Sequence, residues 1–306
     1  MKKLEWLILL IAFDFMALSF KNRSKEVKNQ NVNLNKVYNL SRVPEGVYSI
    51  DESGIVNLYL ILGEKKAMLV DTGMASGNLA GVVSGITDLS VIVVNTHGHC
   101  DHICGNYQFE TIYAPEKDLK LMKTFSNISL RIIAILKNLA KGQGPKYSTI
   151  KRNNRKPVIP FGDGAVFDLG GRTIRAFEIP GHTRGSVLLF DEQNRLLFSG
   201  DSIQRGQMWM FLKESIPLAS YLESLKKVRD IVIKSSIVFP SHTESFAGTE
   251  VVDELINGIG NILNGTATGD PFRKFFIEGR KYDMESCCVI YNPRRLFAER
   301  REGFNL

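Results

Sequence analysis

The sequence predicts an α/β fold in which two layers of β-sheet pack face to face. Two observations support this prediction. Each half of the chain contains several short strand-like runs followed by helical segments, a pattern that favours layered sheets covered by helices. Residues suited to metal binding follow strands in both halves, so one site is expected in the seam between the layers. At 306 residues and 44% hydrophobic content, the chain can bury a sizeable core.

The first half is expected to contain successive antiparallel strands and then a central buried strand. Residues 90–94 form a β-branched run without alternation, which is typical of a strand buried on both faces. Helical spacing of apolar residues continues to residue 141, and the stretch 128–139 could form a lid, a dimer face or ordinary core. The expected strands are residues 46–51, 56–62, 67–71, 90–94 and 111–114, and the expected helices are residues 76–84 and 115–141.

The second half is expected to repeat this architecture with two hairpins. The first hairpin turns at Gly170 and Gly171. Met208, Trp209 and Met210 could line a substrate pocket or belong to the core. The expected strands are residues 165–169, 173–179, 187–190, 196–199 and 237–239, and the expected helices are residues 217–230 and 248–263.

Four potential metal ligands fall within six residues directly after the central strand. They are His97, His99, Asp101 and His102, and imidazole and carboxylate groups suit zinc, iron or manganese. Gly98 allows the tight turn that lets the first two histidines point the same way. Because open α/β sheets keep their sites beyond the carboxyl ends of strands, a metal site is predicted here.

Each of the remaining histidines also follows a predicted strand. The chain has only five histidines; His182 follows residues 173–179 and His242 follows residues 237–239. Asp201 ends another apolar run. A sequence in which every histidine follows a strand indicates a shared metal site rather than scattered polar loops.

Together these motifs resemble those of the metallo-β-lactamase superfamily. The pattern H-x-H-x-D-H covers residues 97–102, P-G-H-T-x-G-S covers residues 180–186, and S-G-D covers residues 199–201, before the late single histidine His242. V-D-T-G at residues 70–73 matches the first motif of the superfamily. The resemblance spans residues 45 to 245, and it implies a four-layer αββα sandwich with a helical insertion at about residues 115–145.

The resemblance also implies a dinuclear site and a role for each ligand. His97, His99 and His182 would hold one ion, and Asp101, His102 and His242 would hold the second, with Asp201 bridging the two ions. Asp71 would orient ligand loops by hydrogen bonds, and Asp101 could pass a proton to the leaving group. The expected cofactors are two divalent ions, zinc first, with manganese or iron as alternatives.

The implied function is a dinuclear-metal hydrolase that cleaves a small ester, thioester or lactone by attack of a hydroxide bridging the ions. A β-lactamase-like or phosphodiesterase hydrolase is one alternative, although Asp201 stands where the β-lactamases tend to carry cysteine. A mono-iron oxidoreductase resembling the persulfide dioxygenases is another alternative, but His102 and His242 together favour two ions.

Composition restricts the partners. The net charge of +7 arises largely from local basic runs, so a solvated basic surface is expected and a nucleic-acid partner is not. The expected partner is a small-molecule substrate, and a homodimer is left open. The four cysteines show no disulfide or zinc-ribbon spacing, and Cys100 is interpreted first as a small buried residue.

The expected domain division places an apolar N-terminal segment and polar linker at residues 1–35, and the catalytic domain at residues 36–306. A C-terminal hairpin is expected at about residues 270–292, formed by residues 275–278 and 287–291. Residues 4–20 are apolar and could be a signal, a membrane anchor or a packed helix. The expected location is the cytoplasm, with membrane attachment through residues 4–20 left open.

Overall fold

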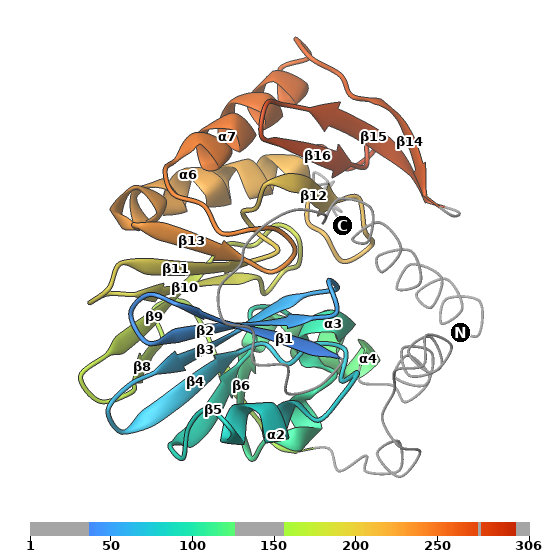
Figure 1. Cartoon of the computed structure of the whole chain (residues 1–306). Helices are drawn as coiled ribbons and strands as arrows, with labels where there is room; N and C mark the ends of the chain where they lie inside the picture. The colour runs from blue at the N-terminus through green and yellow to red at the C-terminus, as the bar shows by residue number, and fades with distance from the viewer. Residues whose placement is uncertain (1–36, 126–155, 275–276, 298–306) are drawn as a thin grey trace, which may run out of the picture.

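The computed structural model describes residues 37–125, 156–274 and 277–297. Two sheets pack face to face, and helices cover the outer side of each sheet (Figure 1). This arrangement confirms the predicted αββα sandwich. The apolar N-terminal segment and most of the expected helical insertion lie outside the described residues. Within the described ranges, no helix is both long enough and apolar enough to cross a membrane.

The first sheet has the strand order β1-β2-β3-β4-β5-β6-β7, antiparallel from β1 to β4 and parallel from β4 to β7. Its strands are β1 (Tyr38–Val43), β2 (Val47–Glu52), β3 (Asn57–Leu62), β4 (Lys66–Val70), β5 (Ser90–Val94), β6 (Thr111–Pro115) and β7 (Val158–Phe161). Its helical elements are α2 (Leu79–Ser84), α3 (Cys100–Ile103), η1 (Asn106–Gln108), η2 (Glu116–Asp118) and α4 (Leu119–Phe125).

The second sheet has the order β13-β11-β10-β9-β8, in which only the β11–β13 pair is parallel. Helices α6 (Leu218–Lys234) and α7 (Glu250–Leu263) cover it. Its strands are β8 (Val166–Asp168), β9 (Thr173–Glu178), β10 (Val187–Asp191), β11 (Leu196–Gly200) and β13 (Ile237–Pro240).

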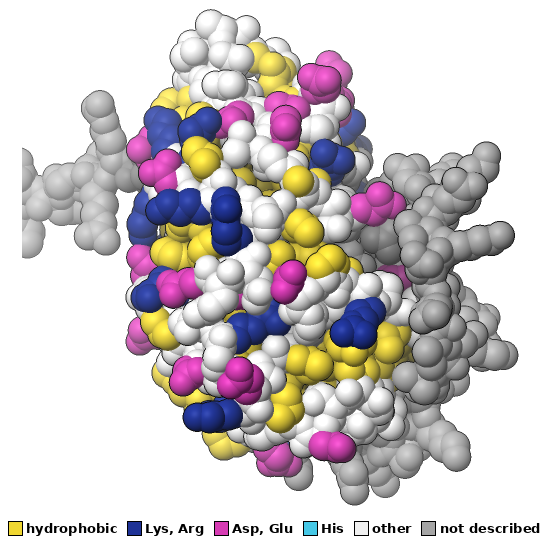
Figure 2. Space-filling view, turned by 60° about the vertical axis from the view of Figure 1, so that its left-hand side comes forward, with side chains coloured by type: hydrophobic (Ala, Val, Ile, Leu, Met, Phe, Trp, Pro, Cys, Tyr) yellow, Lys and Arg dark blue, Asp and Glu magenta, His cyan; other side chains and the backbone are white. Residues whose placement is uncertain are grey.

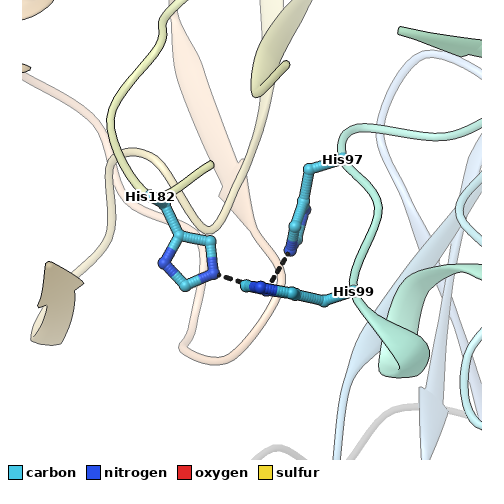
Figure 3. A group of neighbouring side chains, drawn as sticks. All are labelled: His97, His99 and His182. Atoms are coloured by element: carbon cyan, nitrogen blue, oxygen red, sulfur yellow. Dashed lines mark hydrogen bonds between the residues drawn. The ribbon is translucent and has the colours of Figure 1, made fainter. Parts of the chain in front are cut away.

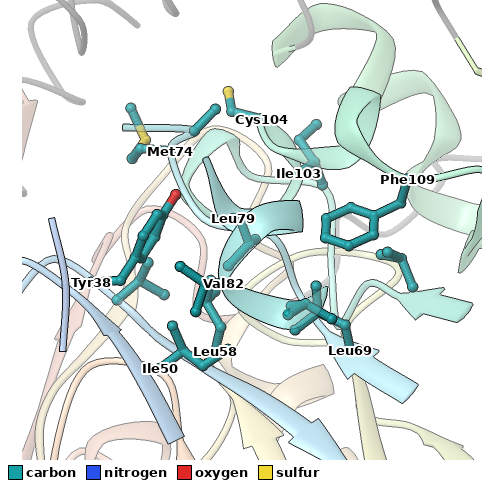
Figure 4. Packing of buried hydrophobic residues seen from close by; sticks show 14 of the residues in the cluster. Tyr38, Ile50, Leu58, Leu69, Met74, Leu79, Val82, Ile103, Cys104 and Phe109 are labelled. Atoms are coloured by element: carbon teal, nitrogen blue, oxygen red, sulfur yellow. The ribbon is translucent and has the colours of Figure 1, made fainter. Parts of the chain in front are cut away.

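Strand β3 explains why the central strands are apolar on both faces. Leu58 and Leu60 enter the cluster beneath the helices of the first sheet, and Figure 4 shows Leu58 together with Leu79 of α2. Tyr59 and Ile61 point the other way, into the cluster between the two sheets. Because side chains alternate along a strand, each central strand of the first sheet contributes to two separate cores.

Aromatic rings fill the seam between the sheets close to the expected site. The rings of Tyr59, Phe198 and Phe239 lie 5.2–5.4 Å apart in a triangle. The hydroxyl of Tyr59 donates to the carbonyl of Pro240 at 2.6 Å, so β3 is tied to the end of β13. The seam is therefore fixed on the side where the ligand loops emerge.

A third sheet, with the order β12-β16-β15-β14, differs from the expected C-terminal hairpin. Strand β16 (Cys287–Tyr291) was predicted, but its antiparallel partner β15 is Ile277–Asp283 rather than residues 275–278. Strands β14 (Asp270–Lys274) and β12 (Gly206–Met210) were not predicted. The mainly polar sequence of β15 carries no apolar pattern, which is why its position was misjudged.

Strand β12 also resolves the role of Met208, Trp209 and Met210. All three side chains are buried in the described structure, so they belong to the core.

Helix α2 begins at Leu79, later than predicted, because the Asn78 side chain caps it by accepting from the Gly81 N–H at 3.0 Å.

The surface is mixed in charge rather than strongly basic on the face shown in Figure 2. Lysine and arginine side chains there are interspersed with aspartate and glutamate, and none of the described histidines is visible on it. The basic runs at residues 21–28 and 146–155 lie outside the described residues, so the interpretation of the net charge as a solvated surface stays a prediction.

The arginine of a buried ion pair in the second sheet links the two sheets. The Nε of Arg172 donates to the Asp191 carboxylate at 2.7 Å, and its Nη1 donates to the carbonyls of Glu45 at 2.5 Å and Leu62 at 3.0 Å. Both charged side chains are buried. Residues 45 and 62 flank strands of the first sheet, whereas Asp191 ends β10 of the second.

We expect Arg172→Ala to lower the free energy of unfolding by about 3–5 kcal/mol, because Asp191 would be left as an uncompensated buried charge. Arg175→Ala is the matched control, since Arg175 on β9 pairs with Glu192 at the surface, and we expect it to cost about 0–1 kcal/mol. Urea unfolding of both variants measures the difference. Equal losses would contradict the assignment of Arg172 as the link between the sheets.

The thiols provide a second test of the packing. All four cysteines are buried, and burial raises the pKa of Cys288 to about 11 and that of Cys100 well above its ordinary value. We expect an aromatic disulfide reagent at pH 8 to modify none of them rapidly in the folded protein and all four in guanidinium. Rapid labelling of the native protein would show that this packing is wrong.

Candidate metal centre

The seven predicted ligands converge at one place, at the carboxyl ends of strands from both sheets. They come from four separate segments of the chain, residues 97–102 and the neighbourhoods of residues 182, 201 and 242. His97 and His99 lie in the loop after β5, Asp101 and His102 lie in α3, His182 follows β9, Asp201 follows β11, and His242 follows β13. All seven are among the side chains that form three mutually close groups of potential ligands.

The first group is made of three imidazoles from the two halves of the chain. Nδ1 of His99 lies 3.0 Å from Nε2 of His97 and 2.9 Å from Nε2 of His182. Figure 3 shows His182 approaching from the second half of the chain while His97 and His99 come from the loop before α3. All three side chains are buried.

The second group lies beside the first and shares a carboxylate with it. Asp101, His102 and His242 place one ligand atom each within 4.8 Å of one another. The Asp201 carboxylate lies 3.4 Å from Nε2 of His182, 3.4 Å from Nε2 of His102 and 3.2 Å from Nε2 of His242. Asp201 therefore reaches imidazoles of both groups, which is the position that the bridging role requires.

Each histidine also has its other ring nitrogen next to an acceptor outside the ligand set. Nδ1 of His97 lies 3.1 Å from Thr96 Oγ1, Nε2 of His99 lies 2.9 Å from Glu214, Nδ1 of His102 lies 2.7 Å from Asp71, Nδ1 of His182 lies 2.8 Å from the Trp209 carbonyl, and Nδ1 of His242 lies 2.8 Å from the Ile55 carbonyl. Carbonyl and carboxylate oxygens only accept, so these outer nitrogens carry the proton.

The inner nitrogens are consequently lone-pair donors aimed at one another. Thr96 fits the same pattern, because its hydroxyl donates to Asp71 at 2.7 Å and so accepts from His97. Two inner atoms, Nε2 of His102 and Oδ1 of Asp201, are buried and make no hydrogen bond within the described residues. Converging acceptors of this kind suit divalent cations, so the residues fit a metal centre.

The electrostatics divide the five histidines into two classes. Burial opposes protonation of His99, His102 and His242, but nearby carboxylates, Glu214 for His99 and Asp201 for the other two, raise the pKa of each of these rings above its ordinary value. Burial lowers the pKa of His97 well below its ordinary value, and burial with the charge of His99 lowers the pKa of His182 to about 4. Burial opposes ionisation of Asp201, but His242 and His102 hold its pKa well below the usual range. Neutral imidazoles and an ionised carboxylate are the forms that bind metal ions.

Asp71 lies outside the three ligand groups and orients them. Its carboxylate accepts from the backbone N–H of Thr96 at 2.8 Å, as well as from the Thr96 hydroxyl and His102. Its backbone has a φ of 60°, an uncommon value for a residue other than glycine. The side chain thus acts through His102 and His97 rather than on a substrate.

Asp118 was not predicted, and it joins the two loops that carry the first group. Its carboxylate accepts from the N–H of Gly98 and the N–H of Gly185, both at 2.8 Å, and from the Thr183 hydroxyl at 2.6 Å. Gly98 lies between His97 and His99, whereas Thr183 follows His182. A single buried aspartate therefore sets the distance between histidines from the two halves of the chain.

Sequence reasoning also missed Glu214, the partner of His99, since it lies in a loop without any motif. Cys100 is buried in the apolar cluster of the first sheet and belongs to none of the ligand groups among the described residues. The motif signals therefore mark the ligands but not the side chains that orient them.

Comparison with known proteins agrees with this geometry. The family model of the metallo-beta-lactamase superfamily matches residues 52–242. The chain is 25% identical over 225 residues to the acyl-coenzyme A thioesterase MBLAC2 of Bos taurus, covering 66% of this chain and 80% of the relative, and the Homo sapiens protein gives the same figures. A beta-lactamase domain protein from Burkholderia ambifaria superposes with a TM-score of 0.54 and 22% identity, covering 74% of this chain and 75% of the other.

We expect Asp118→Ala to weaken metal binding by roughly tenfold or more, as removal of outer hydrogen-bond partners commonly does. Three donors would lose their acceptor, so we also expect a loss of about 1–3 kcal/mol in stability. Metal affinity measured with a competing chromophoric chelator, together with urea unfolding, tests both effects.

Glu116→Ala is the control, because Glu116 lies in the same short helical turn but is exposed. It should leave metal affinity and stability unchanged. If Asp118→Ala bound metal as tightly as this control, the two loops would not depend on Asp118 for their spacing.

Proposed function

Because the chain belongs to the metallo-beta-lactamase superfamily, we propose that it hydrolyses acyl thioesters at a centre of two divalent metal ions. The family and the thioesterase relatives make the chain a hydrolase. The thioester substrate and the pair of ions are the proposed part.

The observation that carries this proposal is the position of Asp201 between two complete ligand groups. His97, His99 and His182 would hold one ion through their inner nitrogens, and Asp101, His102 and His242 would hold the other. The Asp201 carboxylate is within 3.4 Å of imidazoles of both groups. A mono-iron centre would use only the first group and would leave the buried Nε2 of His102 without a role.

Bound divalent ions would lower the pKa of a water molecule and polarise the scissile carbonyl. The outer partners already orient the rings so that the inner nitrogens of the neutral tautomers face one another, and little movement of the side chains is needed. Asp101, whose carboxylate lies 3.4 Å from Nε2 of His242, is the acidic side chain placed to hold the attacking water and to pass its proton onward.

The relatives support thioesters as the substrate class, since MBLAC2 is named an acyl-coenzyme A thioesterase. In this reaction water adds its oxygen to the acyl carbon, the carbon–sulfur bond breaks, and the sulfur leaves with the electron pair. The products are a carboxylic acid and a thiol. A thiol has a pKa of about 8.5, far below that of an alcohol, so the leaving group needs little help from an acid.

The proposal predicts that the purified protein binds close to two equivalents of zinc, manganese or iron and hydrolyses an acyl-coenzyme A. Asp201→Ala and His102→Ala should each lower kcat by at least about 100-fold. Thiol release and metal content measured on the same samples test this. Chelation followed by return of a divalent ion should remove and then restore activity.

Arg175→Ala, on the surface of β9, is the control and should keep wild-type turnover. A simple ester, a lactone, a phosphodiester and a chromogenic β-lactam should be compared with the thioester. Faster turnover of any of these would replace the proposed substrate, and full activity of both ligand variants would overturn the metal mechanism.

A further inference from the structure

We propose that Glu214 is a positioning residue that holds metal ligand His99, and that Arg295 near the C-terminus fixes the loop carrying it. This inference rests on the proposed metal centre and adds two residues to it. Both residues lie outside the motifs that define the ligands, and Arg295 lies beyond residues 52–242 that match the family model.

The contact between Glu214 and His99 fixes one ring in one tautomer. Oε1 of Glu214 lies 2.9 Å from Nε2 of His99, although the two residues are 115 positions apart. That nitrogen donates its proton to the carboxylate, so Nδ1 keeps its lone pair. Nδ1 is the atom that faces His97 and His182.

His99 needs such a partner more than its neighbours do. The outer nitrogens of His182 and His242 donate to main-chain carbonyls, one in strand β12 and one in the turn between β2 and β3. His99 instead depends on a side chain, just as His102 depends on Asp71 in the second group. Each ligand group thus contains one histidine oriented by a carboxylate, which makes the imidazole a stronger ligand.

Arg295 holds the loop on which Glu214 lies. Its Nη1 donates to the carbonyl of Leu212 at 2.8 Å and to that of Lys213 at 3.2 Å, and its Nη2 donates to the carbonyl of Ser215. These three carbonyls flank Glu214 on both sides. A single guanidinium from the C-terminal segment therefore sets the backbone of the loop between β12 and α6.

The same loop is also tied to the third histidine of the group. The N–H of Ile216 donates to the carbonyl of Gly181, next to His182, at 2.9 Å. The C-terminal segment is bonded to the start of α6 as well, because the N–H of Leu218 donates to the Arg295 carbonyl at 3.1 Å. The loop thus connects Arg295, Glu214 and the first ligand group into one hydrogen-bonded unit.

The test compares Glu214→Ala and Glu214→Gln with Glu223→Ala in the full chain. Glu223 is exposed on α6 and pairs only at the surface with Lys226, so it is a matched loss of one carboxylate. Chelator-treated proteins are titrated with Co²⁺ against a competing chromophoric chelator, and the visible Co²⁺ spectrum is recorded. Thermal unfolding without added metal reports any general loss of structure.

We expect Glu214→Ala to weaken the tighter Co²⁺ site by about 10- to 100-fold and to change its visible spectrum. Glu214→Gln keeps an acceptor oxygen without the charge, so it should fall between Glu214→Ala and the wild type. The metal-free Glu214 variants should still unfold cooperatively, with a modest loss of stability relative to Glu223→Ala because the buried N–H of His99 loses its charged acceptor. Arg295→Lys keeps the charge but loses the fork of donors, so it should weaken Co²⁺ binding severalfold.

Wild-type affinity and spectrum in Glu214→Ala would overturn the inference, and wild-type affinity in Arg295→Lys would overturn the role of Arg295. Failure of the proposed function is a separate result. If the wild type binds Co²⁺ more tightly than Glu214→Ala but hydrolyses no thioester, the positioning role stands and the substrate assignment falls.

Discussion

The direction of five imidazole lone pairs is the constraint on which the rest of the site depends. A neutral imidazole has one donor and one acceptor nitrogen, and its surroundings decide which is which. In this protein four outer nitrogens face an oxygen from a distant segment, and that of His97 faces the hydroxyl of neighbouring Thr96, so in each neutral ring the inner nitrogen is the acceptor. The hydrogen bonds around the ligands therefore determine which nitrogen of each ring can bind a metal ion.

These outer bonds also explain why the two sheets must meet in one register. The carbonyls of Ile55 and Trp209 reach the histidines only when the segment before β3 and strand β12 are in their observed positions. Asp118 bonds to both loops that carry the first ligand group and so fixes the distance between them. The aromatic contacts of the seam and the buried Arg172–Asp191 pair hold that register some distance away. The contacts that hold the two sheets together therefore also hold the metal ligands in position.

The sequence predicted the ligands and the main architecture because both leave local patterns. Strand β5 was predicted with its observed ends, since a short β-branched run without alternation favours a strand buried on both faces. Strands β1 and β14 and the position of β15 were missed because their residues are polar and partly exposed. Asp118, Glu214 and Arg295 carry no local signal at all, because their roles come from contacts between distant segments.

Strand β12 pairs in parallel with β16, about eighty positions later in the chain, with Trp209 opposite Ile290. The carbonyl that orients His182 belongs to this pair. The orientation of His182, which follows a strand of the second sheet, therefore depends on the position of a strand in the third sheet.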